Sequence, residues 1–147
     1  MPLLVQSIPY IFKLILGLNL LISGYMWVGV PIVVNVNFPD GSGIAGISSG
    51  PFIVINTDYA EEGTADYEEV FRHEYTHYIQ TMVYTPLGTS AYSTYRVVSN
   101  FIKYGPKNYF FLYYKDNALE EQAFEYQSNK ALKLPKNYFK INLRLNW

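Results

Sequence analysis

The chain has 147 residues, of which 50% are apolar and 16% charged, and its formal net charge is −1. This length and composition predict a single folded domain over residues 1–147 and argue against intrinsic disorder. The small net charge offers no basic surface for nucleic acid. Because cysteine is absent, disulfides, thiolate nucleophiles and cysteine metal ligands are excluded, and any metal must be bound through nitrogen and oxygen.

The N-terminal segment is strongly apolar. Lys13 is the only charged side chain in residues 1–39, and residues 14–39 carry no charged side chain. Residues 8–22 predict an apolar helix, and residues 1–24 fit a membrane anchor, a first helix that is buried or faces a partner protein, or an unprocessed signal peptide. Polar residues, glycines and a proline interrupt the apolar run and argue against a full membrane span: Asn19, Ser23, Gly24, Gly29 and Pro31.

Two short β segments follow the N-terminal helix. Residues 30–38 are rich in β-branched side chains and predict a strand. Turn residues at 39–43 come next, and residues 44–47 and 52–55 predict one returning strand that is interrupted at Gly50-Pro51. The expected product is an antiparallel hairpin.

The remaining elements alternate between helices and turns. Asp66 and Glu69 have the spacing of a capping box and predict a helix that ends near residue 84, before Pro86 and Gly88. A second helix is predicted at residues 92–103, whereas the aromatic run at 109–114 has no assignable period.

A later helix is predicted from Asp116 or Asn117 to about residue 132. The tail at residues 138–147 alternates like a half-buried strand. Its apolar face carries Phe139, Ile141, Leu143, Leu145 and Trp147.

The pattern His-Glu-x-x-His occurs once, at residues 73–77, inside the first of these predicted helices. The four-residue spacing puts His73 and His77 on one helix face, where both imidazoles can reach one Zn²⁺. Glu74 is turned about 100° away from His73, beside the metal, where its carboxylate can take a proton from metal-activated water. The alternative is that these are two ordinary helix histidines. Random placement would put two histidines four residues apart, with a glutamate directly after the first, on the order of once in a thousand arrangements.

A catalytic zinc site needs a third protein ligand and one open position. Since both histidines are used, the third ligand must be a carboxylate. The acidic residues after His77 all belong to the start of one predicted helix: Asp116, Glu120, Glu121 and Glu125. Glu120 and Glu121 differ by about 100° in direction, so at most one of them faces the metal.

These residues resemble a known group of enzymes. His73-Glu74-x-x-His77-x-x-Gln80, followed on a later helix by Asn117-x-x-Glu120-x-x-Ala123, is similar to the gluzincin group of zinc metallopeptidases and to its small or membrane-associated relatives. The resemblance covers about residues 53–130.

The resemblance implies an α+β, zincin-like domain with a short, mainly antiparallel sheet and two helices that carry the site. It makes His73, His77 and Glu120 the metal ligands and Glu74 the general base. It also implies that residues 52–55 form the edge strand that binds an extended peptide.

Two features depart from the resemblance. Many gluzincins have an acidic residue shortly after the glutamate ligand that orients a histidine, and here Gln122 and Phe124 occupy the nearby positions. The candidate substitutes are Asp116, Asn117 and Glu125. The group that stabilises the oxyanion is a tyrosine, Arg72 or Arg96, although Arg72 fits better as a surface or salt-bridging residue.

The predicted function is zinc-dependent hydrolysis of peptide bonds in a peptide or protein substrate. The alternative is a non-catalytic or structural zinc-binding component of a membrane-associated or larger assembly. A non-peptide amide or ester hydrolase is a third reading. Glu74 favours an enzyme, because a purely structural zinc site needs no general base. The tail either completes the sheet and packs on a core or partner, or lies along the substrate-binding edge and occludes the cleft.

Overall fold

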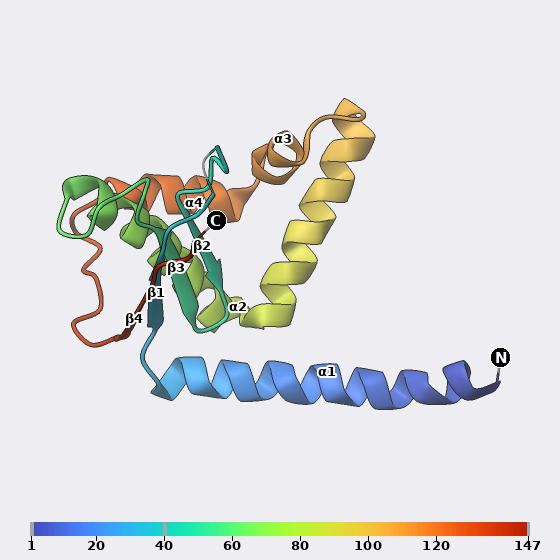
Figure 1. Cartoon of the computed structure of the whole chain (residues 1–147). Helices are drawn as coiled ribbons and strands as arrows, with labels where there is room; N and C mark the ends of the chain where they lie inside the picture. The colour runs from blue at the N-terminus through green and yellow to red at the C-terminus, as the bar shows by residue number, and fades with distance from the viewer. Residues whose placement is uncertain (1, 40, 147) are drawn as a thin grey trace.

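The computed structural model describes residues 2–39 and 41–146. This part of the chain is an α+β domain, as predicted (Figure 1). Its elements in chain order are α1 (Pro2–Val28), β1 (Ile32–Val36), β2 (Gly46–Ser49), β3 (Phe52–Asn56), α2 (Ala65–Tyr104), α3 (Tyr109–Tyr114), α4 (Ala118–Gln127) and β4 (Phe139–Leu143). Asp40 of the predicted turn and Trp147 of the predicted tail strand lie outside the described residues.

The sheet is mixed, with the strand order β2-β3-β1-β4. β1 pairs in parallel with both β3 and β4, and among the described strands only β2 and β3 pair antiparallel. The prediction of a mainly antiparallel sheet is therefore wrong. The hairpin forms at Gly50, whose φ of 55° suits the first position of a two-residue turn, and not at residues 39–43. The helices then carry the chain back so that β4 enters parallel to β1.

The strand order also changes which strand lies at an edge. β3 is internal, so the prediction that residues 52–55 form an edge strand is wrong, and β2 is the edge strand on that side. β4 lies at the opposite edge of the sheet. The tail therefore completes the sheet, as one reading predicted, and does not occlude the β2 edge.

One face of the sheet forms the core. Val33, Ile53 and Ile55 are fully buried there and pack against Phe71 and Tyr78 of α2. The apolar side of the tail lies on the other face, and its expected burial is wrong, because the described side chains on that side are 42–63% exposed. They are Phe139, Ile141, Leu143 and Leu145.

Helix α2 consists of two segments, residues 65–84 and residues 86–104. Thr85 separates them with a non-helical conformation, φ 67° and ψ 158°, which confirms the predicted stop before Pro86. The Thr85 hydroxyl accepts a hydrogen bond from Gly88 N at 3.2 Å, so Thr85 caps the second segment and Pro86 occupies its first turn. Figure 1 shows the second segment leaving the sheet and rising away from α1.

The caps of the other helices only partly match the prediction. α2 is capped by Thr64, whose hydroxyl accepts from Tyr67 N, and not by Asp66. Asn117 caps α4 by accepting from Leu119 N, as one of the two predicted alternatives. α4 ends at Gln127, earlier than the predicted end near residue 132.

Helix α1 projects from the domain (Figure 1). Its C-terminal part contacts the core through Ile22, Tyr25 and Met26. Within the described chain, Ser7–Val28 is the one helix whose length and composition suit a membrane span, and only 11% of its apolar window is buried. A buried first helix is therefore wrong for this chain, whereas membrane and partner contacts remain predictions.

Candidate metal centre

Two helices bring together the three predicted ligands. His73 and His77 lie one turn apart on the first segment of α2, and Glu120 lies in the first turn of α4. The two Nε2 atoms are 3.2 Å apart. His73 Nε2 lies 3.4 Å from Glu120 Oε2, and His77 Nε2 lies 3.3 Å from Glu120 Oε1. Ligand atoms held about 2.0–2.1 Å from a tetrahedral zinc ion lie roughly 3.3–3.4 Å from one another.

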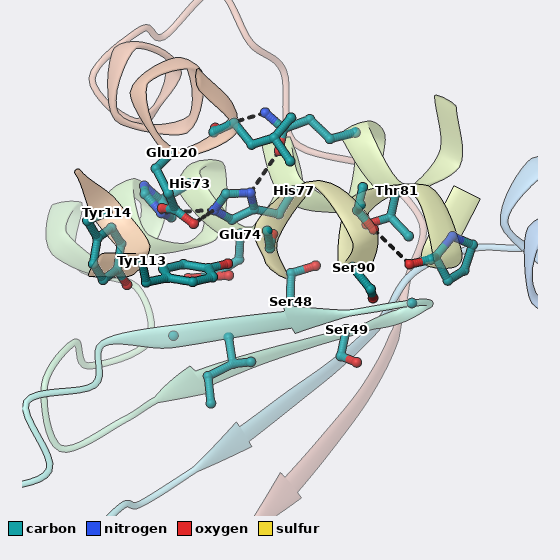
Figure 2. A pocket seen from close by; sticks show the side chains of 18 of the residues that line it. Ser48, Ser49, His73, Glu74, His77, Thr81, Ser90, Tyr113, Tyr114 and Glu120 are labelled. Carbon is teal, nitrogen blue, oxygen red and sulfur yellow. Dashed lines mark hydrogen bonds and ion pairs between the residues drawn. The ribbon is translucent and has the colours of Figure 1, made fainter. Parts of the chain in front are cut away.

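The same three residues form a group whose ligand atoms all lie within 4.8 Å of one another. Figure 2 shows Glu120 and the two imidazoles converging on one side of α2. Glu120 is 3% exposed, and its Oε2 is a buried atom with no hydrogen-bond partner among the described residues. A buried carboxylate oxygen without a donor is costly, so this donor set fits a cation.

Two glutamine side chains set the orientation of the imidazoles. Gln80 Nε2 donates to Leu119 O and to Gln122 Oε1, both at 2.9 Å. These bonds turn Gln80 Oε1 toward His77 Nδ1, 2.8 Å away, so Nδ1 carries the proton and Nε2 presents a lone pair.

Gln127 makes the matching contact to the other ligand. Its Oε1 lies 3.2 Å from His73 Nδ1, which leaves His73 Nε2 as an acceptor as well. Two nitrogen lone pairs and a carboxylate therefore point into one small volume. They repel one another unless a cation or a proton lies between them.

The electrostatics of Glu120 and His77 agree with this geometry. Burial raises the pKa of Glu120, but His73 and His77 in their protonated forms outweigh it through hydrogen bonding and charge and lower that pKa to about 2. Burial lowers the pKa of His77, and hydrogen bonding and charge from Glu120, followed by the charge of Glu74, raise it above its ordinary value. Glu120 is therefore ionised at neutral pH, and its carboxylate attracts either a proton on His77 or a metal cation.

Glu74 lies beside the ligands and against the edge strand. It is 6% exposed, and burial raises its pKa to about 7, although His77 and His73 act in the opposite direction. A Cβ atom on Gly46 would lie 2.8 Å from Glu74 Cγ and 2.9 Å from Glu74 Oε1. The absence of a side chain at Gly46 thus lets β2 approach the carboxylate closely.

Two neighbouring cavities next to the candidate ligands form a cleft. A cavity of about 490 Å³ lies on one side and a cavity of about 380 Å³ on the other, and both are lined by His73, Glu74 and Gly46. Ser48 of β2 points toward the site (Figure 2). Polar side chains of the second segment of α2 line the larger cavity: Thr89, Ser90 and Ser93.

Two tyrosines of α3 complete the wall of the cleft. Tyr113 and Tyr114 line the larger cavity (Figure 2). Burial, then the charge of Glu120, raises the pKa of Tyr113. Burial, then the charges of Glu120 and Glu74, raises the pKa of Tyr114 to about 12. Both phenols therefore stay protonated at neutral pH and can donate a hydrogen bond.

The other candidates from the sequence lie away from the ligands. Arg72 is buried, donates from Nε to Gln127 O and pairs with Glu68, so the salt-bridging interpretation is confirmed. Arg96 lies 4.0 Å from Asp116, and neither residue lines the cleft. Glu121 is exposed.

None of the predicted substitutes orients a histidine. Asp116 pairs with Lys103 and Tyr104, Asn117 caps α4, and Glu125 is exposed. The sequence analysis missed Gln127, Tyr113 and Tyr114. The aromatic run at 109–114 was a usable signal, because Asn108 precedes it and caps α3.

Comparison of the chain with protein-family models, curated proteins and solved structures found no significant match.

Proposed function

We propose that this chain is a zinc-dependent hydrolase of peptide bonds, with His73, His77 and Glu120 as ligands and Glu74 as general base. The observation that carries the proposal is the spacing of 3.2–3.4 Å between the ligand atoms, with a second carboxylate, that of Glu74, beside them. A purely structural zinc site closes with a fourth protein ligand. Glu74 instead lies at the wall of an open cleft.

Zinc at this site would polarise both a water molecule and the carbonyl of the scissile bond. Glu74 accepts the proton of the attacking water and delivers it to the leaving amine. Glu74 lies against Gly46, so its carboxylate is close to the edge strand β2 and to a substrate peptide that would pair with β2. The hydroxyl groups of Tyr113 and Tyr114 are the donors that face the cleft and can stabilise the oxyanion.

An extended peptide is the substrate that suits this cleft. β2 pairs with β3 on one side only, so its other edge offers backbone donors and acceptors to an added strand. The cavities on both sides of Glu74 leave room for residues before and after the scissile bond. This arrangement supports cleavage within a chain and not only at its end.

The test compares Glu74→Gln with Glu121→Gln, an exposed glutamate on α4. The full-length, zinc-loaded protein is incubated with an unfolded protein substrate, and new N-termini are counted. Glu74→Gln should retain zinc and lose about 10²–10⁴-fold in rate, because Gln cannot accept a proton. Glu121→Gln should match the wild type. Equal turnover in Glu74→Gln would overturn the proposed mechanism, and zinc binding without turnover in the wild type would favour a structural component.

A further inference from the structure

The second segment of α2 has the reverse of the usual polarity. Its polar side chains face the cleft and the α3 contact, where Thr89, Ser90 and Ser93 line the cavity and Asn100 is fully buried. From Tyr95 onward its apolar side chains recur three or four residues apart on the outer face, and Leu87 lies on the same face about two turns earlier. These side chains are 46–78% exposed: Leu87, Tyr95, Val98, Phe101 and Ile102. We call them the outer stripe.

Helix α1 is joined to the beginning of this stripe. Asn19 Oδ1 accepts a hydrogen bond from Leu87 N at 2.8 Å. Thr85 breaks the helix just before this point, so Leu87 N has no carbonyl partner within α2, and α1 supplies one. The exposed apolar surfaces of the two helices are therefore continuous.

Helix α1 is apolar on every side. Successive residues are turned by about 100°, so its exposed apolar residues surround the helix axis. Ile8, Leu14, Leu16 and Leu20 lie on different sides of the axis, and each is 42–63% exposed. A second protein covers one face of such a helix, whereas lipid covers all of them. Lys13 can extend its amine toward water while its aliphatic stem stays in an apolar medium.

The solvent-accessible surface of the chain is larger than that of a soluble monomer of the same mass, as expected if an apolar partner covers part of it. The chain exposes 9932 Å², whereas a soluble monomer of 17.0 kDa exposes roughly 7,700 Å². Aromatic side chains of the type found at membrane interfaces lie on this surface, among them Trp27 at 65% and Tyr95 at 61% exposure.

We propose that α1 enters a lipid bilayer and that the outer stripe lies on the same bilayer. The cleft then opens at the membrane surface, with the polar side of the second segment as its wall. The proposal does not depend on zinc or on catalysis, because it uses only the exposed surfaces of α1 and α2.

Labelling tests the proposal directly, since the chain has no cysteine to remove. Single-cysteine variants Leu14→Cys, Val98→Cys, Phe101→Cys and Glu61→Cys of the full chain carry a nitroxide, and Glu61, exposed in the turn before α2, is the control. Each protein is placed in vesicles of phosphatidylcholine and phosphatidylglycerol. Collision rates with oxygen, which concentrates in lipid, and with a water-soluble nickel complex are measured.

Labels at 14, 98 and 101 should gain oxygen collisions and lose nickel collisions several-fold on transfer from detergent to vesicles, while the label at 61 stays accessible to nickel. Nickel access at both 98 and 101 with lipid contact at 14 would overturn the proposal, because α1 alone would then be embedded. Protection from both reagents, together with spin–spin broadening, would assign the stripe to a second copy. Failure of the chain to float with vesicles would also contradict it.

Discussion

The two segments of α2 differ in which side chains they bury and which they expose. The first segment buries polar and charged groups, among them Arg72, Glu74 and Gln80, each 4–6% exposed. The second segment exposes large apolar groups, such as Val98 at 52% and Ile102 at 78%. In an isolated soluble protein both arrangements are unfavourable.

The first segment compensates its buried groups with specific partners. Arg72 bonds Gln127 and Glu68, and Gln80 bonds His77, Leu119 and Gln122. The converging atoms of His73, His77 and Glu120 are the exception, and the proposed cation would satisfy them. The apolar groups of the second segment are not covered by the domain and need an apolar medium outside it. A buried polar group is stabilised by one or two specific hydrogen-bond partners, so the loss of a single atom matters. An exposed apolar group is stabilised in proportion to the area that an apolar medium covers, so no single contact decides it.

The largest effect is expected from the partner of His77. Gln80→Leu keeps a similar volume but removes the oxygen that accepts from His77 Nδ1. The imidazole can then rotate or change its tautomer, so zinc affinity should fall about 10–100-fold in competition with a coloured chelator. Gln80→Glu retains an acceptor oxygen and should bind zinc as well as the wild type or more tightly. Unchanged affinity in Gln80→Leu would show that Gln80 does not hold the ligand.

A smaller effect should appear in the stability of the zinc-free protein. The pKa of Glu74 is raised from its ordinary 4.5 to about 7. Its protonation therefore stabilises the fold below pH 4.5, and that contribution is lost as the pH rises to about 7. Gln is neutral at every pH, so zinc-free Glu74→Gln should melt several degrees above zinc-free wild type at pH 8 and match it at pH 4. An equal difference at both pH values would contradict this cause.

The smallest effect is expected on the outer stripe. Val98→Gln should change the free energy of unfolding in mild detergent by no more than about 0.5 kcal/mol, because Val98 is 52% exposed on the outer face. Asn100→Ala, two residues away, should cost about 1–3 kcal/mol, since Asn100 Nδ2 donates to Leu112 O and Lys115 O. Similar losses in both variants would end the distinction between the two faces of the second segment.

Local patterns predicted which residues come together in the candidate site. His73, Glu74 and His77 were identifiable because helix geometry alone puts them together. Glu120 was selected by resemblance, and Asn117 was one of two candidate caps. The tail strand was recognised from its alternation. These features depend on neighbours along the chain, so sequence reasoning reaches them.

Features that depend on contacts between distant segments were missed or assigned wrongly. The hairpin was expected at residues 39–43, because turn residues are dense there as well as at Gly50, and local chemistry does not rank the two turns. Gln127 reaches His73 only through the approach of α4 to α2. The apolar period of the second α2 segment is visible in the sequence, but which face meets the cleft depends on tertiary packing.

The most direct test of the account is the zinc content of four purified proteins: wild type, His77→Ala, Glu120→Ala and Glu121→Ala. Elemental analysis after dialysis against a weak chelator should find about one zinc per chain in the wild type and in Glu121→Ala. His77→Ala and Glu120→Ala should lose most of it, because two ligands rarely hold zinc. Full occupancy in Glu120→Ala, or loss in Glu121→Ala alone, would contradict the centre formed by His73, His77 and Glu120.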